Sequence, residues 1–138
     1  MGGFWSAKQW QEELQREEIL CYGSWNPEKA DQLLGLSCGW VVAEELQISM
    51  VLVDPAVRQQ GLGTMLLKEL LRKAEALGCL MASLEVSENN IAAIALYENS
   101  GFTTSRIRGN YYQNGDNALV KVKNLCKLDL VRITGQIS

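Results

Sequence analysis

The chain contains no histidine among its 138 residues. Histidine often serves as a general base near neutral pH, and it is a common ligand of catalytic metal ions. Its absence excludes every mechanism with a histidine base and argues against a catalytic metal site. Acid–base chemistry in this protein therefore has to use carboxylate, tyrosine, cysteine, lysine or water.

The chain also lacks closely spaced cysteines. Its four cysteines lie far apart in the sequence, at Cys21, Cys38, Cys79 and Cys126. Zinc sites usually draw on pairs of nearby cysteines. We therefore expect no metal ion, and reduced thiols as in a cytosolic protein. No cysteine lies next to a recognisable base, so a cysteine nucleophile is a poor candidate.

Long apolar runs and basic runs are missing too. No stretch approaches the ~20 apolar residues that a helix needs to cross a bilayer, and the start lacks the regions of a signal peptide. The formal net charge of −3 argues against a nucleic-acid surface. We therefore expect a cytoplasmic protein without membrane or direct nucleic-acid contact. Its length allows a single domain over 1–125, followed by a tail of unknown role over 126–138.

The sequence does contain alternating strand and helix patterns. Strand–helix–strand connections and hairpins together predict an α/β fold with a mixed sheet and helices on both faces. Within the strand over 81–86, alternation places Met81, Ser83 and Glu85 on one face. The expected helices cover 7–18, 64–77 and 91–99, and the expected strands cover 19–22, 33–42, 48–53, 81–86, 102–107 and 117–122.

The stretch from Val51 to Thr64 organises the rest of the chain. An apolar strand leads into a proline turn, then a polar loop with Gly61 and Gly63, then an amphipathic helix. The first amides of a helix have no partner inside the helix, so this layout is typical of an anion-binding site. Glycines let the backbone close on a phosphate, and Arg58 adds a full charge. The spacing matches neither the Walker motif nor the dinucleotide fingerprint.

The run Arg58-Gln59-Gln60-Gly61-Leu62-Gly63 resembles the acyl-CoA diphosphate loop of the GCN5-related N-acetyltransferase (GNAT) superfamily. Further motifs are similar in order and spacing to one branch, the bacterial enzymes that acetylate the N-terminal alanine of ribosomal protein S18. They are Leu84-Glu85-Val86, Asn90 with the run 92–98, Gly101-Phe102 and Arg108-Gly109-Asn110-Tyr111-Tyr112. The resemblance covers residues 48–123 well and 4–47 weakly.

The resemblance implies a twisted mixed sheet whose two central strands splay apart to leave a slot for acetyl-CoA. It also implies the residues that hold this cosubstrate. The backbone of the strand Val51, Leu52 and Val53 pairs with the pantetheine arm, and Asn90 donates or accepts a hydrogen bond there. The diphosphate is held by Arg58, Gln59, Gln60, Gly61, Leu62, Gly63 and Thr64.

Two residues carry the expected chemistry. Glu85 lies at the end of an apolar strand, where burial would raise its pKa, and an acceptor amine with a pKa near ~8 needs a base. Tyr97 lies two helical turns from Asn90, on the same helix face. The resemblance implies that Glu85 is the base and that Tyr97 contacts acetyl-CoA and donates a proton to the leaving thiolate. From the residues alone, a solvated glutamate, a core tyrosine and a helix-capping asparagine remain open.

The loop after the strand over 102–107 carries the expected substrate contacts. The resemblance implies that Arg108, Tyr111 and Tyr112 receive the substrate peptide; a tyrosine-rich surface turn is the alternative. Gly109 stands where the family often has a second basic residue, so we expect weaker peptide contacts. Members of the branch usually have a strand before the segment Phe4-Trp5-Ser6. Without this strand we expect a less stable protein. We expect it to be a monomer or a weak dimer.

Together these features predict an acetyl-CoA-dependent N-acetyltransferase without a metal ion, which transfers acetyl directly to a protein N-terminus such as that of ribosomal protein S18. Three alternatives stay open. The acceptor amine could be a lysine, a polyamine or an antibiotic, because one fold serves many acceptors. The chain could be a non-catalytic acyl-CoA-binding module. A nucleotide enzyme is disfavoured because no lysine follows the second glycine.

Overall fold

The computed structural model describes residues 6, 8, 19–58 and 60–125. Outside these residues lie the predicted helix over 7–18, except for Lys8, together with Gln59 and the tail over 126–138. In chain order the described elements are β1 (Ile19–Asn26), β2 (Lys29–Val42), β3 (Glu45–Val53), the 3-10 turn η1 (Pro55–Val57), α2 (Leu62–Ala76), β4 (Met81–Ser87), α3 (Ile91–Asn99), β5 (Thr103–Arg108) and β6 (Ala118–Asn124).

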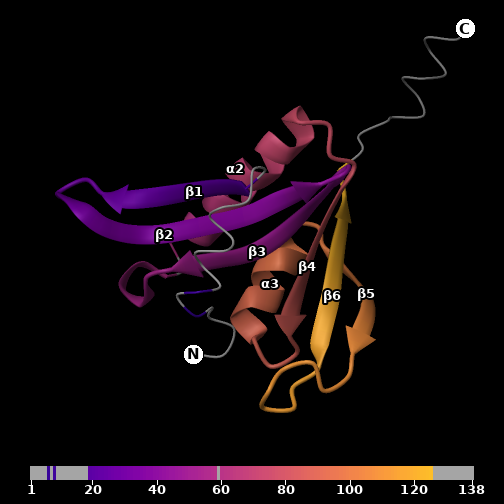
Figure 1. Ribbon diagram of the computed structural model, residues 1–138. Coiled ribbons are helices and arrows are strands. Elements are labelled where there is room, and N and C mark those ends of the chain that lie inside the picture. Colours follow the sequence, from indigo (N-terminus) through magenta and orange to yellow (C-terminus); the bar gives the residue numbers. More distant parts are fainter. Residues whose placement is uncertain (1–5, 7, 9–18, 59, 126–138) are drawn as a thin grey trace, which may run out of the picture.

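The strands form one mixed sheet in the order β1-β2-β3-β4-β6-β5 (Figure 1). The β3–β4 pair is parallel and the other four pairs are antiparallel. This confirms the predicted mixed α/β sheet. The first hairpin is longer than expected, because β1 and β2 pair as far as Asn26 and Lys29. The Asn26 side chain accepts a hydrogen bond from the Glu28 amide, so the turn is confined to Pro27 and Glu28.

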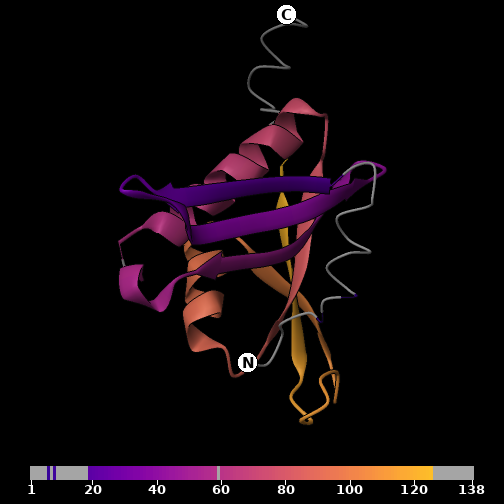
Figure 2. The same ribbon diagram turned by 60° about the vertical axis from the view of Figure 1, so that its left-hand side comes forward.

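The two central strands splay apart. β3 and β4 pair over only three positions, Glu45 with Met81, Leu46 with Ala82 and Gln47 with Ser83. Beyond these positions β3 continues to Val53 and β4 to Ser87 in different directions, and Figure 2 shows β1, β2 and β3 crossing the direction of β4, β6 and β5. At the base of the splay the Ser83 hydroxyl donates to the Glu45 carboxylate at 2.6 Å. The predicted splay of the two central strands is therefore confirmed.

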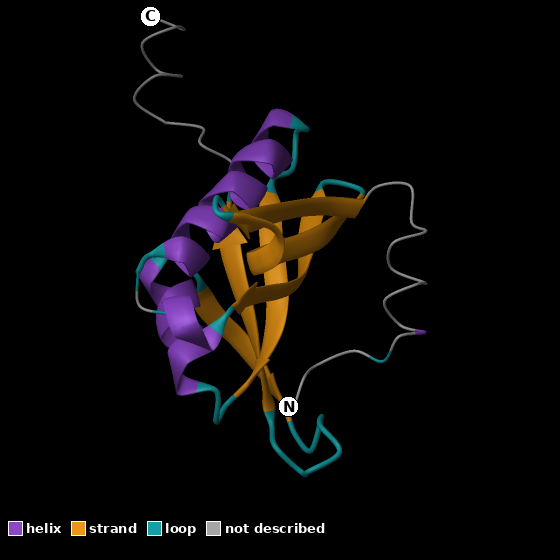
Figure 3. Cartoon of the chain, turned by 90° about the vertical axis from the view of Figure 1, so that its left-hand side faces the viewer, coloured by secondary structure: helices purple, strands orange, loops and turns teal. Residues whose placement is uncertain are grey.

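The core lies between the sheet and the two described helices, which both cover the same face (Figure 3). Helices were predicted on both faces, and the described residues show them on one face only. The alternation predicted for β4 is confirmed, since Ala82, Leu84 and Val86 are buried against the helices while Glu85 lies on the other face. α2 contributes a stripe of buried residues, each Leu being worth ~1.5–3 kcal/mol on burial. The stripe consists of Leu66, Leu67, Leu70, Leu71 and Ala74.

Close contact with β2 fixes the start of α2. A Cβ atom on Gly35 would lie 2.7 Å from Cδ1 of Leu66 and 3.1 Å from Cδ2 of Leu62, so a side chain there would force these two leucine side chains to move. The buried Ser37 hydroxyl donates to the Leu66 carbonyl at 3.0 Å. These contacts hold the N-terminus of α2 at the open end of the splay. Neither α2 nor α3 has the length and apolarity to cross a membrane.

Candidate active site

The predicted diphosphate loop begins where β3 ends. The Asp54 carboxylate accepts a hydrogen bond from the Ala56 amide at 2.8 Å and so caps η1. The chain then reaches Gly61, the N-cap of α2, which has a φ of 80°. A Cβ atom there would meet nothing within 4 Å, so the backbone conformation, rather than lack of space, favours glycine. Among the described residues no side chain caps the N-terminus of α2, so its first amides are available to an anion.

Gly63 has a different role. A Cβ atom there would lie 3.4 Å from Cγ2 of Val53 and 3.6 Å from Cδ2 of Leu96. The first turn of α2, the end of β3 and α3 therefore meet at this glycine. The strand that is expected to bind pantetheine thus lies beside the helix that carries Asn90 and Tyr97. The other predicted loop residues Arg58, Gln60 and Thr64 are exposed around this junction, and Leu62 is half-buried.

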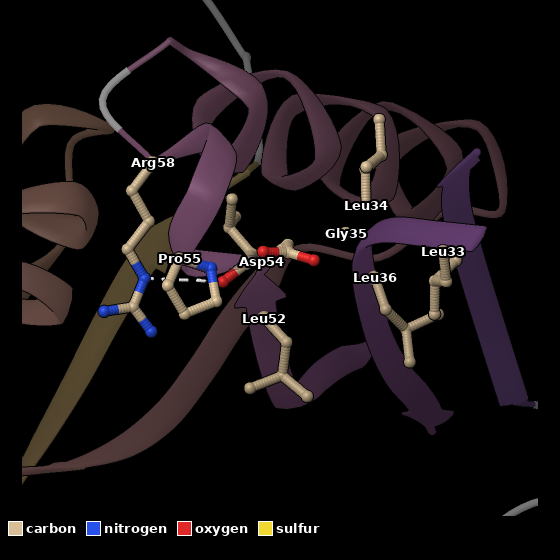
Figure 4. A pocket seen from close by; sticks show the side chains of 9 residues that line it. Leu33, Leu34, Gly35, Leu36, Leu52, Asp54, Pro55 and Arg58 are labelled. Carbon is tan, nitrogen blue, oxygen red and sulfur yellow. Dashed lines mark hydrogen bonds between the residues drawn. The ribbon is translucent and has the colours of Figure 1, made fainter. Parts of the chain in front are cut away.

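A pocket of ≈240 Å³ lies against the paired ends of β2 and β3 and the turn that follows β3 (Figure 4). Its rim includes Arg58, whose Nε donates to the Val53 carbonyl at 3.4 Å. Its walls are mostly apolar, formed by Leu33, Leu34, Gly35, Leu36, Leu52, Val53 and Pro55 together with Asp54. Of the predicted site residues, Leu52, Val53 and Arg58 line this pocket, whereas Glu85, Asn90 and Tyr97 do not.

α3 presents the predicted proton donor. Asn90 caps the helix, with its side-chain oxygen accepting from the Ala93 amide at 3.2 Å, so the capping role considered from the sequence is confirmed. Tyr97 is only 6% exposed and belongs to the hydrophobic core, so the core position considered from the sequence is confirmed. Its ring packs edge-on against Phe102, with the centroids 5.8 Å apart. Burial, aided by the charge of Tyr112, raises the pKa of Tyr97 to about 12. The phenol therefore keeps its proton at neutral pH.

Glu85 lies on the face of β4 opposite the core. The burial expected for this residue is wrong, since its side chain is 31% exposed. The reason is that strand alternation assigns Glu85 to a face without specifying what covers that face. The side chain has partners nonetheless. Its Oε1 lies 3.7 Å from Nη1 of Arg108, and a hydrogen bond to Glu85 raises the pKa of Tyr111.

The structure brings all three predicted substrate residues together with the predicted base. The Arg108 guanidinium lies over the Tyr111 ring, 5.5 Å from its centroid. The rings of Tyr111 and Tyr112 meet edge to face at 5.1 Å. Burial, and then the charge of Glu85, raise the pKa of Tyr112. Glu85, Arg108, Tyr111 and Tyr112 therefore form one cluster, which the sequence had suggested only as separate motifs.

Sequence reasoning missed the polar residues that hold this cluster. We name the segment 109–117 between β5 and β6 the tyrosine loop. It is bound to the turn after β4 through Asp116 and Asn117, which we had assigned only to an irregular loop and to the start of the last strand. The run Asn114-Gly115-Asp116-Asn117 is rich in turn-forming side chains, and that was the available signal. Among the described residues no group of three or more Cys, Asp or Glu side chains could hold a metal ion.

The profile of the acetyltransferase (GNAT) family matches residues 2–102. The chain belongs to the GNAT family. This confirms the resemblance on which the site residues were named. The S18-alanine N-acetyltransferase of Escherichia coli superposes with a TM-score of 0.78 at 32% identity, over 91% of this chain and 80% of that one.

The alignments with curated relatives cover a smaller part of this chain than the structural superposition does. The [ribosomal protein bS18]-alanine N-acetyltransferase of Salmonella typhimurium is 42% identical over 82 residues, which is 59% of this chain and 55% of the relative. That of Escherichia coli K12 is 45% identical over 76 residues, 55% of this chain and 51% of the relative. The chain thus spans about half the length of the curated relatives it matches. The NatC complex bound to Gag peptide and CoA, at 20% identity and a TM-score of 0.77, is similar in fold.

Proposed function

We propose that this GNAT chain transfers the acetyl group of acetyl-CoA to the α-amino group of a protein N-terminus, in the cytoplasm, and that its acceptor is the N-terminal alanine of ribosomal protein bS18. The observation that carries the proposal is the contact of Glu85 with Arg108 and Tyr111 beyond the last β3–β4 pair, at Gln47 and Ser83. A carboxylate in this position can accept a proton beside a surface built for a peptide. The similarity to S18-alanine acetyltransferases supports the choice of acceptor.

The residues present fit the acetyl-CoA that the family uses. The uncapped N-terminus of α2, opened by the positive φ of Gly61, suits the diphosphate. The backbone of Val51 and Val53 and the side chain of Asn90 would hold the pantetheine arm, although the Val53 carbonyl already accepts from Arg58. When bound, acetyl-CoA supplies the acetyl group as an activated thioester.

The chain's own groups would supply proton transfer and placement. An α-amine with a pKa near ~8 is mostly charged at neutral pH, and only the neutral form is a nucleophile. Glu85 takes the proton from the amine, directly or through water. Tyr97, protonated throughout the neutral range, gives a proton to the departing sulfur. Arg108, Tyr111 and Tyr112 orient the acceptor peptide, which contributes to rate by placement.

The test is turnover with defined peptides, followed by release of free thiol. We expect acetylation of a short peptide that begins Ala-Arg. No reaction is expected with the same peptide blocked at its N-terminus and carrying an internal lysine. Glu85→Gln should bind CoA as the wild type does and react much more slowly. Turnover of the blocked peptide would indicate a lysine acceptor. Tight CoA binding without turnover of any amine would indicate a binding module and overturn the proposal.

A further inference from the structure

The tyrosine loop is tied to the turn after β4 by one carboxylate. Asp116 Oδ2 accepts a hydrogen bond from the Ser87 hydroxyl at 2.9 Å, and Oδ1 accepts from Nδ2 of Asn89 at 2.9 Å. Nδ2 of Asn114, within the loop, donates to Oδ2 at 3.1 Å. Both oxygens of Asp116 are therefore used, and two of the three donors belong to a segment far away in the sequence.

A second tie runs parallel to the first. The Glu88 amide donates to the Asn117 carbonyl at 3.0 Å, and Nδ2 of Asn117 donates to the Glu88 carboxylate at 3.2 Å. The Asn117 side-chain oxygen accepts from the Asn110 amide at 3.0 Å, which closes the base of the loop. Without the Asp116 tie these bonds still fix both ends of the loop. The part that the Asp116 carboxylate holds in addition is therefore the stretch 111–116, which begins with the two tyrosines.

The backbone connects Asp116 directly to Tyr112. The Tyr112 amide donates to the Asp116 carbonyl at 3.2 Å, and the Gly115 amide donates to the Tyr112 carbonyl at 2.9 Å. At the other end of the tie, Ser87 lies two residues after Glu85 on β4, on the same face of the strand. One carboxylate thus joins the end of the strand that carries the base to the backbone that carries the substrate tyrosines.

The tie consists of charge-assisted hydrogen bonds. The hydrogen bond from Ser87, followed by those from Asn114 and Asn89, lowers the pKa of Asp116. The carboxylate therefore stays ionised at neutral pH, and hydrogen bonds to an ionised acceptor are stronger than neutral ones. Such bonds give the loop tip a defined position even though the loop is largely exposed.

We propose that Asp116 is a positioning residue for the acceptor peptide: it fixes the tyrosine loop against β4 so that Arg108, Tyr111 and Tyr112 face Glu85. Asp116 acts through these residues and is not itself a catalytic residue. The inference rests on the proposed function, because the acceptor that these side chains receive is the peptide of that proposal. Binding of acetyl-CoA depends on β3, α2 and α3, so it should not depend on Asp116.

The kinetic test varies the peptide at saturating acetyl-CoA, and then acetyl-CoA at saturating peptide. Asp116→Ala should raise the KM for the peptide by about 10-fold or more, because misplacement of a positioning surface is costly, and leave the KM for acetyl-CoA unchanged. Asp116→Asn keeps the size and one acceptor oxygen, so its effect should be intermediate. Asn89→Ala removes the hydrogen bond that Asp116 accepts from Asn89, which lies outside the loop. This variant should also raise the KM for the peptide.

Ser105→Ala is the matched control. The Ser105 hydroxyl donates to the Val120 carbonyl at 3.3 Å, so this change also removes a side-chain hydrogen bond between β5 and β6 without touching the tie. It should leave both KM values unchanged. An equal loss of kcat in Asp116→Ala and Ser105→Ala, with the peptide KM unchanged in both, would mean that Asp116 serves stability alone and would overturn the proposal.

Hydrogen exchange separates this inference from the proposed function. The amides of residues 110–112 should exchange faster in Asp116→Ala and Asn89→Ala than in the wild type, while β4 and β6 stay protected. If the wild type acetylates no amine, the proposed function fails while the exchange result still shows whether Asp116 holds the loop. If the wild type acetylates the peptide and neither exchange nor peptide KM changes in the variants, the positioning role is wrong and the transferase stands. Should Asp116→Ala fail to fold, Asp116→Asn and Asn89→Ala decide the outcome in the same way.

Discussion

The Nη1 atom of Arg108 lies 3.7 Å from Oε1 of Glu85. Both side chains are partly exposed, at 42% and 31%, so this ion pair contributes little to stability, ~0–1 kcal/mol. Its importance is spatial, because it connects the proposed base on β4 to the end of β5 and the start of the tyrosine loop. In the proposed reaction, an acceptor amine at Glu85 would lie next to Arg108 and Tyr111.

Removal of the base should slow transfer in a pH-dependent way. Glu85→Gln keeps the shape of the side chain and removes its ability to take a proton, so we expect a loss of about 100-fold or more in kcat at neutral pH. The difference in kcat between the wild type and Glu85→Gln should become smaller above pH ~8, where the peptide amine is increasingly neutral without a base. Steady-state rates measured across pH 6 to 9.5 with the Ala-Arg peptide check this. A uniform loss at all pH values, or no loss, would contradict the role of Glu85 as a base.

The diphosphate loop should depend on its glycine more than on its arginine. Gly61 has a φ of 80°, which valine adopts only with strain, and we propose that the backbone amides beyond it bind the diphosphate. We expect Gly61→Val to weaken acetyl-CoA binding by about 10-fold or more and Arg58→Ala by only a few-fold, as measured by calorimetry.

Gly78 provides the control for that comparison. It has a φ of 91° and open space around it, and it lies just beyond the other end of α2. Gly78→Val therefore introduces similar strain away from the loop and should lower the stability of the protein without changing acetyl-CoA affinity. Abolished binding in Arg58→Ala together with intact binding in Gly61→Val would refute the backbone account.

Tyr97 should make stability fall in alkaline solution. Its pKa is raised from 10.0 to about 12, so the folded state keeps a proton that the unfolded state releases. The corresponding stabilisation, roughly 2 to 3 kcal/mol, is fully present below pH 10 and is lost as the pH rises towards 12. Urea unfolding at several pH values above 9 should show a steeper fall for the wild type than for Tyr97→Phe. Parallel curves for the two proteins would show that this phenol does not carry the effect.

The ion pair between Lys121 and Glu98 should lose more stability when Glu98 is replaced than when Lys121 is replaced. Nζ of Lys121 is 2.7 Å from Glu98 and 2.8 Å from the Thr104 hydroxyl, and Lys121 is 1% exposed while the Glu98 side chain is 56% exposed. Glu98→Ala leaves a buried ammonium with only a hydroxyl partner, so we expect a loss of ~3–5 kcal/mol. Lys121→Met removes the buried charge and leaves Glu98 in water, so the cost should be ~1 kcal/mol. Urea unfolding of both variants checks the order, and a larger loss for Lys121→Met would contradict it.

The sequence predicted local structure well where local signals decide it. α3 runs over Ile91–Asn99 as expected, because Asn90 caps its start and Gly101 takes a φ of 95° beyond its end. The alternation of β4 gave the correct face for Glu85. The first hairpin was predicted too short, with strands over 19–22 and 33–42, because long-range pairing with β2 carries β1 as far as Asn26.

The candidate site could be predicted only in parts. The resemblance named Glu85, Arg108, Tyr111 and Tyr112, but their assembly depends on contacts between segments that lie far apart in the chain. The tie between Ser87 and Asp116 spans 29 positions, so no local pattern reveals it. The expected burial of Glu85 was wrong for a related reason, because a strand pattern does not state what covers each face.

The most direct test of the central claim is mass spectrometry of ribosomal protein bS18 from Escherichia coli cells that lack their own S18-alanine acetyltransferase and express this chain. We predict that the N-terminal alanine is acetylated when the wild-type chain is expressed and largely unmodified when Glu85→Gln is expressed at the same level. An unmodified alanine in the presence of the folded wild-type chain, or equal acetylation by the two proteins, would contradict the account.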